Sequence, residues 1–138
     1  PRGAVPRDHL APVALRGAVA SAGPAGEQPG NAVDGDASTR WTSGQAQQPG
    51  QYLRVDLNRP VQFRRVAVDS GGNLGDYARG WELAVSLDGT TWRTVATGAG
   101  NGQLTTVDLP RTRARHLRVT TTAAAGNWWS VADVRLYD

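Results

Sequence analysis

The sequence contains no cysteine and no lysine, and it has no long hydrophobic run. Without cysteine, the chain has no disulfide framework, no zinc–thiolate site and no cysteine nucleophile. Its apolar stretches fall far short of the roughly 20 residues that a transmembrane helix needs. No repeat of solenoid period is present, so a chain of 138 residues is expected to form one domain with its own core.

The positive charge of the chain comes from arginine alone. The formal net charge is +3, and the high isoelectric point follows from the absence of lysine, which titrates below arginine. A nucleic-acid-binding surface needs a clustered basic stripe. Here the arginines are spread over separate segments, as at Arg54, Arg64, Arg65, Arg118 and Arg135. We interpret them as solvent-facing strand positions and expect no nucleic-acid partner.

Short segments with an apolar residue at every second position predict β-strands with one buried face. The clearest segments are 53–57, 81–85, 117–119 and 134–136. Turn-forming residues separate them, at 58–60, 71–73, 87–89, 98–102 and 123–127. No segment has a helical period. The chain is therefore predicted to be all-β, with short antiparallel strands in a sandwich or barrel.

The first residues differ in composition from the rest. Residues 1–12 contain three prolines and no periodicity. They are predicted to be a linker remnant or a loosely docked tail, and residues 13–138 to be the domain.

The most informative segment, residues 31–41, reads N-A-V-D-G-D-A-S-T-R-W. It gathers two carboxylates, a threonine hydroxyl and a glycine within a few residues. Calcium takes several oxygen ligands at roughly 2.3–2.6 Å, and such a loop can supply them from side chains and carbonyls together. The alternative is a metal-free turn held by Asx hydrogen bonds.

Taken with residues 128–137, which read W-W-S-V-A-D-V-R-L-Y, this loop makes the chain resemble the discoidin family. That family is also called the coagulation factor V/VIII C-type domain, and its bacterial sugar-binding branch is carbohydrate-binding module family 32. The segments 51–57, 80–92 and 114–119 fit the same family, so the resemblance extends from about residue 15 to residue 138. It implies an antiparallel jelly-roll β-sandwich with its two termini close together.

The resemblance also implies a structural calcium ion. The implied ligands are the carboxylate of Asp34, the carbonyl of Asp36, the hydroxyl and carbonyl of Thr39, the carbonyl of Ala132, the carboxylate of Asp133 and a carbonyl of Asn31. Asp133 stands where relatives usually carry the longer glutamate. The ion would join an early loop to the last strand.

In the sugar-binding relatives, the ligand lies on loops at one end of the sandwich. Two loops here, 69–79 and 123–128, combine an aromatic ring for the C–H face of a sugar with planar polar groups for its hydroxyls, and their glycines allow close backbone approach. The candidate ligand-binding residues are Asp69, Asn73, Asp76, Tyr77, Arg79, Asn127 and Trp128. Amides in a third loop, 43–49, could line the same site. The alternative roles are loop solvation, a structural Tyr77–Arg79 contact and a rim position for Trp128.

Trp128 and Trp129 are adjacent, so on a strand they face opposite sides. We predict that Trp129 is buried and that Trp128 is an exposed platform. Trp41, Trp81 and Trp92 are expected in the core or a hairpin. The two histidines, His9 and His116, are not where galactose-binding members carry theirs, and acidic residues on the loops would suit a glucan or an amino sugar. The ligand class stays open between a glucan, a galactoside and an amino-sugar polymer.

These features favour a non-catalytic carbohydrate-binding module, monomeric and secreted, that tethers a covalently linked bacterial glycoside hydrolase to polysaccharide. The alternative is a cell-surface adhesion domain that binds protein or lipid. That branch of the family carries exposed apolar residues on its loops, commonly bracketed by cysteines. This chain has no cysteine, so no membrane partner is expected here. An enzyme is a third possibility, with Asp69 and Asp76 as a carboxylate pair. A shallow loop surface excludes water poorly, and no serine–histidine motif is present.

Overall fold

The computed structural model describes residues 10–24, 26 and 28–138. Its elements in chain order are β1 (Pro12–Val13), β2 (Val19–Gly23), the 3-10 helix η2 (Pro29–Ala32), β3 (Trp41–Gln47), β4 (Tyr52–Asp69), β5 (Trp81–Ser86), β6 (Arg93–Gly98), β7 (Leu104–Thr121), β8 (Ala125–Val131) and β9 (Asp133–Tyr137). Every strand pair is antiparallel, which confirms the predicted all-β class. None of the helical turns among these residues is long and apolar enough for a membrane span.

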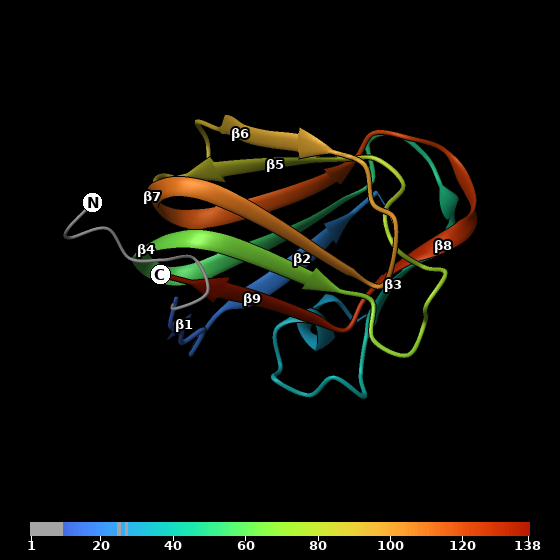
Figure 1. The fold of residues 1–138 in the computed structure, drawn as a ribbon, viewed down its shortest axis with the longest axis horizontal. Helices are drawn as coiled ribbons and strands as arrows, with labels where there is room; N and C mark the ends of the chain where they lie inside the picture. Colours follow the sequence, from blue (N-terminus) through green and yellow to red (C-terminus); the bar gives the residue numbers. More distant parts are fainter. Residues whose placement is uncertain (1–9, 25, 27) are drawn as a thin grey trace.

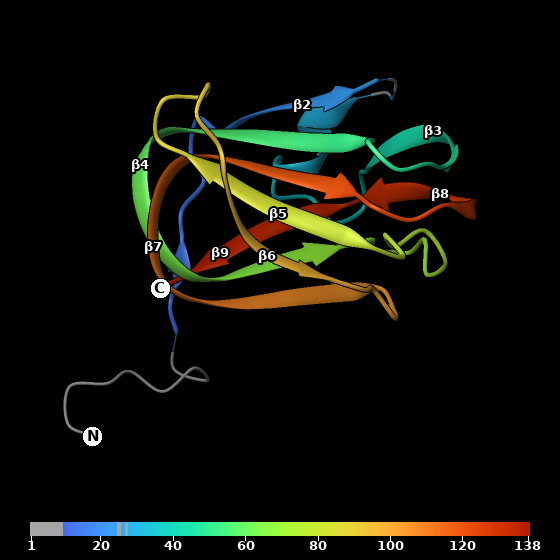
Figure 2. The same ribbon diagram turned by 90° about the horizontal axis from the view of Figure 1, so that it is seen from above.

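Two long strands, β4 and β7, join the two layers of the sandwich. The first part of β4 pairs with β2, and its last part pairs with β9. Between these parts the register with β7 shifts from Asp56 to Val61, and Asn58 has a positive φ of 72°. The strand bends there, so β2, β5 and β6 form one layer with half of β4 and β7, while β1 and β9 join the other half (Figures 1 and 2).

The predicted turn at Asn58-Arg59-Pro60 is therefore a bend inside one strand and does not separate two strands. Pairing with β7 resumes at Val61, because the backbone groups on either side keep a partner in the same neighbouring strand. A bulge of this kind increases local twist and lets a sheet fold over its own core.

The core lies between the layers and follows the predicted alternation. In β4, Leu53, Val55 and Leu57 are buried, while Arg54 and Asp56 are only partly covered. The largest group of buried side chains surrounds Phe63 and Leu117. A second group lies near the β3–β8 sheet, where Trp41 and Trp129 meet edge-to-face with ring centroids 4.8 Å apart.

The two adjacent tryptophans are divided as predicted. Trp129 is 1% exposed and Trp128 is 46% exposed. Strand alternation sends one ring into the core and the other into solvent.

The beginning and end of the described chain lie side by side, as the resemblance implies. The backbone N–H of Ala11 donates to the carbonyl of Asp138, and the N–H of Asp138 donates to the carbonyl of Ala11, both at 2.9 Å. Pro12 pairs with Tyr137 in the β1–β9 ladder. The predicted tail over residues 1–12 thus includes Pro12, which belongs to β1, and Ala11, which is hydrogen-bonded to Asp138. Edge pairing uses backbone groups and leaves no apolar period in the sequence. Residues 1–9 of that tail lie outside the described residues.

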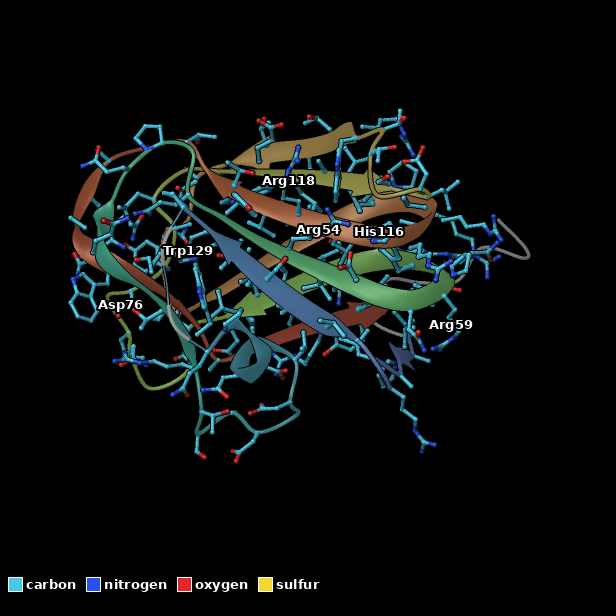
Figure 3. The ribbon with its side chains drawn as sticks, turned by 180° about the vertical axis from the view of Figure 1, so that it is seen from behind. Arg54, Arg59, Asp76, His116, Arg118 and Trp129 are labelled. Atoms are coloured by element: carbon cyan, nitrogen blue, oxygen red, sulfur yellow. The ribbon has the colours of Figure 1, made fainter. Side chains whose placement is uncertain are left out.

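The sandwich has two different ends. The β3–β8 sheet and the loop over residues 70–80 lie at one end, and the bends of β4 and β7, the β5–β6 turn, β1 and the C-terminus lie at the other (Figures 1 and 2). Asp76 and Arg59 mark these opposite ends in Figure 3, with Trp129 between the sheets.

Candidate functional site

Arg79 connects the 70–80 loop to β8. Its Nη1 donates to the carbonyls of Gly75 at 2.9 Å and Tyr77 at 2.7 Å, and its Nη2 donates to Asn127 Oδ1 at 3.0 Å. The guanidinium carbon lies 3.8 Å from the centroid of the Tyr77 ring. The structure therefore brings together three of the predicted ligand residues, and exposed Trp128 follows Asn127 in β8. We call Tyr77, Arg79, Asn127 and Trp128 the loop cluster.

Gln47, the last residue of β3, holds the backbone of the loop cluster through hydrogen bonds. Its side chain is completely buried. It donates to the carbonyl of Tyr77 at 2.8 Å and, more weakly, to that of Trp128 at 3.4 Å, and it accepts from the N–H of Arg79 at 3.1 Å. The sequence suggested that amides in this segment could line the ligand site, whereas this amide is a buried positioning residue. No local pattern distinguishes Gln47 from its exposed neighbours Gln45 and Gln48.

Asp76 attaches the same loop to β8 and to Arg40, the residue before β3. Its Oδ2 accepts from Ser130 Oγ at 2.7 Å and forms an ion pair with Arg40 at 3.6 Å, while its carbonyl accepts from the N–H of Ser130 at 2.9 Å. The amide of Asn73 is near the carbonyl of Ser70 at 3.5 Å. Both candidate residues therefore have partners within the protein, and their roles as ligand groups stay predictions.

Asp69, at the end of β4, has a different set of neighbours. Its Oδ1 accepts from the N–H of Gly71 at 2.7 Å and from Gln103 Nε2 at 3.0 Å, and its Oδ2 is 3.4 Å from Arg135 Nη2. Burial acts to raise the pKa of Asp69, but these hydrogen bonds and the charge of Arg135 outweigh burial and lower the pKa. None of these polar contacts is to the loop cluster.

The loop that the sequence predicts to bind calcium brings several oxygens together. Asp34 Oδ1 accepts from the N–H of Asp36 at 3.0 Å, and Asp34 Oδ2 accepts from Thr39 Oγ1 at 2.5 Å. The same Thr39 hydroxyl is 2.9 Å from the carbonyl oxygen of Asp36. The Asn31 amide donates to the carbonyl of Arg40 at 3.0 Å, which closes the loop. Three of the implied ligand groups therefore converge.

Asp133 supplies a second carboxylate from the start of β9. Burial is the main cause that raises the pKa of Asp133, and the charges of Asp69 and Asp34 raise it further against the opposing effect of Arg135. Asp34 and Asp133, far apart in the sequence, are thus close enough to repel each other. Together with carbonyl and hydroxyl oxygens they form a donor set that fits a hard divalent cation. Among the described residues, no three acidic, histidine or cysteine side chains gather as metal ligands, so backbone oxygens would have to supply part of the shell.

Gly71 lies where the two regions meet. Its φ is +66°, and a Cβ built there would lie 2.7 Å from the Ala132 Cβ and 3.3 Å from the Ala37 carbonyl oxygen. The 70–80 loop therefore packs directly against both the 31–41 loop and the residue before β9.

Comparisons with known proteins agree with this architecture. A family model described as the F5/8 type C domain matches residues 18–134. The family 32 CBM of NanJ from Clostridium perfringens, solved in complex with galactose, is 20% identical, with a TM-score of 0.80 and coverage of 94% of this chain and 99% of that one. A comparison with curated protein sequences found no match.

Two further solved structures have higher sequence identity. Chitosan-binding module 1 of a chitosanase/glucanase from Paenibacillus sp. IK-5 is 28% identical, with a TM-score of 0.75 and coverage of 94% of this chain and 100% of that one. The CBM32 of AlyQ, in complex with 4,5-unsaturated mannuronic acid, is 27% identical, with a TM-score of 0.70 and coverage of 86% and 92%.

Proposed function

The chain belongs to the F5/8 type C (discoidin) domain family, and on that premise we propose that it is a non-catalytic carbohydrate-binding module. The observation that carries the proposal is the exposed ring of Trp128 in β8, where the preceding residue, Asn127, accepts a hydrogen bond from Arg79. The solved relatives support it, since their names refer to galactose, chitosan and mannuronic acid.

The loop cluster has the chemistry that sugar recognition needs. An indole ring can cover the apolar C–H face of a pyranose, while a guanidinium and an amide can bond neighbouring hydroxyls. Gln47 and Asp76 already hold the loop, so little conformational entropy would be lost on binding. An open surface with few contacts should bind one sugar unit weakly, with a Kd of roughly millimolar to high micromolar.

We further propose that the module is secreted and tethers a bacterial glycoside hydrolase to its polysaccharide. The described ends of the chain lie at the opposite end of the sandwich from the loop cluster (Figure 1). A catalytic domain joined there would leave the loop cluster uncovered. Tethering would raise the effective concentration of the enzyme at its substrate without adding a catalytic group here.

A structural calcium ion is part of the proposal. Asp34, Asp36, Thr39, Ala132 and Asp133 would hold it, with Asn31 at the edge of the loop. The ion would neutralise the two carboxylates and join the 31–41 loop to β9. The convergence of Asp34, Asp36 and Thr39 and the repulsion between Asp34 and Asp133 support this assignment.

The test is a glycan-array and affinity-gel screen of the protein beside Trp128→Ala. We expect retention on one glycan class and a loss of about tenfold or more in the variant, because the main stacking surface is gone. Val19→Ala is the control, since Val19 is 63% exposed on β2, away from the loops. The proposal fails if the protein binds no glycan, or if Trp128→Ala binds as the unaltered protein does.

One observation favours the second candidate, an adhesion domain. Leu74 is 64% exposed in the 70–80 loop, so two large apolar side chains, Leu74 and Trp128, are exposed at the same end of the sandwich. A lipid surface could receive them. Co-sedimentation with anionic vesicles that is lost in Leu74→Ser, together with an empty glycan screen, would establish this alternative.

A further inference from the structure

Residues of the β5–β6 turn line an open groove. This turn lies at the end of the sandwich away from the β3–β8 sheet (Figures 1 and 2). The lining of the groove includes Leu87, Asp88, Thr91, Trp92, Arg93 and Arg113, and its volume is about 380 Å³. That volume is within the range of small-ligand sites. We call it the hairpin groove. Residues of the turn meet Arg113 there because β5 and β7 are neighbours in the sheet.

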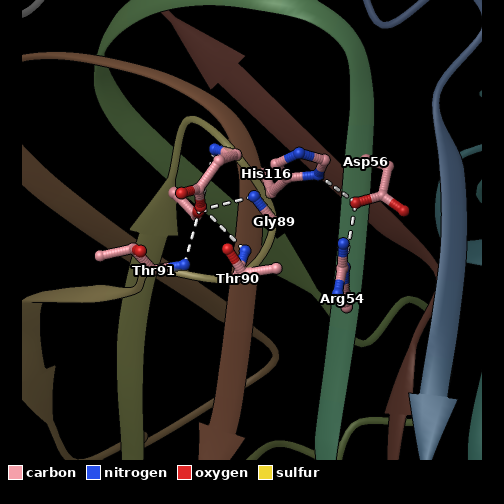
Figure 4. Close-up of polar contacts among 8 residues, drawn as sticks. Arg54, Asp56, Gly89, Thr90, Thr91 and His116 are labelled. Atoms are coloured by element: carbon pink, nitrogen blue, oxygen red, sulfur yellow. Dashed lines mark hydrogen bonds and ion pairs between the residues drawn. The ribbon is translucent and has the colours of Figure 1, made fainter.

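Trp92 is one of the residues that line this groove, and its ring packs against side chains of the sheet. The guanidinium carbons of Arg118 and Arg54 lie 4.3 and 5.2 Å from its ring centroid. These two arginines stand opposite each other on β7 and β4. Arg54 Nε donates to Asp56 Oδ1 at 3.0 Å, and the same oxygen contacts His116 Nδ1 (Figure 4). The tryptophan therefore has a fixed support and needs little ordering before it receives a ligand.

The charged side chains of the hairpin groove differ in how many hydrogen bonds they form within the protein. Asp88 Oδ1 accepts from the N–H groups of Thr91 at 2.7 Å and Thr90 at 2.9 Å, and from Ser86 Oγ at 3.0 Å. Arg93 and Arg113 are exposed, and neither side chain forms a hydrogen bond or ion pair with another residue in the described part of the chain. The hairpin groove thus offers two unpaired guanidinium groups beside one carboxylate that the turn already uses.

We propose that the hairpin groove is a second ligand-binding site, which takes the carboxylate-bearing sugar of an acidic polysaccharide. A guanidinium fork matches a planar carboxylate with two parallel hydrogen bonds. The Trp92 ring would cover the C–H face of the same uronic acid unit. Two arginines suit a chain with one carboxylate per sugar, whereas a densely sulfated polymer would need a denser basic cluster. This proposal does not depend on the ligand of the loop cluster.

Two sites at opposite ends of one domain have a consequence for binding. A polysaccharide network could be held at both ends, and the combined affinity would exceed that of either site without new contacts. Arg115, exposed two residues after Arg113 on the same face of β7, extends the positive surface beyond the groove.

The experiment is a calorimetric titration with trigalacturonate, its methyl ester and dextran sulfate. The proteins are the unaltered chain, Arg93→Gln/Arg113→Gln, Trp128→Ala and the charge-matched control Arg16→Gln/Arg59→Gln, whose arginines do not line the groove. We expect trigalacturonate to bind the unaltered chain, Trp128→Ala and the control equally. Affinity should fall by roughly tenfold or more in Arg93→Gln/Arg113→Gln. The methyl ester should not bind, and this comparison needs no variant.

Several results would overturn the proposal. Equal loss in the charge-matched control would show general attraction to net charge. Loss in Trp128→Ala would place the acid on the loop cluster. Binding of the ester as tightly as the acid, or no binding of the acid at all, would remove the role of the arginines. Tighter binding of dextran sulfate would replace the uronate by a sulfated ligand and contradict the proposal as stated.

Discussion

The loop cluster and the hairpin groove both contain arginine and tryptophan, but their arginine side chains differ in whether they have partners within the protein. Arg79 in the loop cluster donates to three oxygens of the protein, whereas Arg93 and Arg113 in the groove have no partner among the described residues. An arginine that is already bonded contributes fixed geometry, and an arginine without a partner contributes charge. The loop cluster should therefore select a ligand by shape and hydroxyl pattern, and the groove should select one by charge.

The largest effect should come from the buried indole next to the loop cluster in the sequence. Trp129→Ala removes a buried indole that packs edge-to-face on Trp41. We expect a loss of about 3–5 kcal/mol in the free energy of unfolding, measured with guanidinium chloride. Trp128→Ala, the adjacent and exposed indole, should change it by less than about 0.5 kcal/mol. Similar losses in both variants would contradict the assignment of one ring to the core and one to the ligand.

Gln47→Ala should weaken ligand binding at the loop cluster and leave ligand binding at the hairpin groove unchanged. The N–H of Arg79 would lose its acceptor and the carbonyl of Tyr77 would keep only Arg79 Nη1 as a donor, at an expected cost of about 1–3 kcal/mol in unfolding free energy. Binding of the sugar at the loop cluster should weaken, while trigalacturonate should bind the groove as before. Gln48→Ala, with an exposed side chain, is the control. Equal loss of both ligands would show that the two regions are not independent.

Calcium removal should act on the end that holds the loop cluster. At a calcium concentration about 100 times its Kd, binding would add about 2.7 kcal/mol of stability. We expect EDTA to lower the Tm by the corresponding amount and Asp34→Asn to abolish that response. Asp36→Asn should keep it, because only the backbone carbonyl of Asp36 is an implied ligand. A Tm that is insensitive to EDTA would leave the 31–41 loop as a metal-free turn.

Salt should distinguish the two regions directly. Raising the ionic strength from about 0.05 to 0.5 M shortens the Debye length and screens exposed charges. Trigalacturonate binding should weaken by roughly three- to tenfold. Binding of a neutral sugar to the loop cluster should change little over the same range. A salt-dependent loop cluster would remove the contrast drawn between the two sites.

The smallest effect concerns the turn over the groove. The N–H of Thr91, then that of Thr90, lowers the pKa of Asp88 below its usual value. Because the pKa is lower in the folded state, Asp88 stabilises the fold above the pKa of the unfolded chain, near 3.9. This contribution is lost as the pH falls below that value toward the folded pKa. Asp88→Asn should thus have a lower free energy of unfolding than the unaltered protein at pH 6, and its stability should fall less steeply as the pH is lowered. Glu82→Gln, in β5, is the control and should show neither change.

The sequence predicted those features that local patterns encode. Alternation located the buried faces of β4 and β9, and adjacency separated Trp128 from Trp129. In β5 it located Leu83 and Val85, but Ala84 and Ser86 are buried as well. The family motifs identified the jelly-roll fold. The segments 70–80 and 125–128 do meet, through Arg79 and Asn127.

Other features depend on contacts between distant segments. The continuity of β4 through Asn58-Arg59-Pro60 is set by pairing with β7, which no local signal reports. Gln47 looks like any surface glutamine, and its role follows from burial against residues about 30 and 80 positions away. Arg113 reads as a solvent-facing strand residue, and only the neighbouring β5–β6 turn makes it part of a groove.

The side-by-side ends of the chain also determine how the domain would respond to tension. Pulling Leu10 and Asp138 apart would load the antiparallel β1–β9 pair, beginning at the two bonds between Ala11 and Asp138. In this geometry, hydrogen bonds open one after another like a zipper, at lower force than bonds that are sheared together. The 31–41 loop and the loop cluster would stay outside the first part of this force path. Tension applied between the two chain ends would therefore peel this edge of the sheet before it reached the surface that holds the ligand.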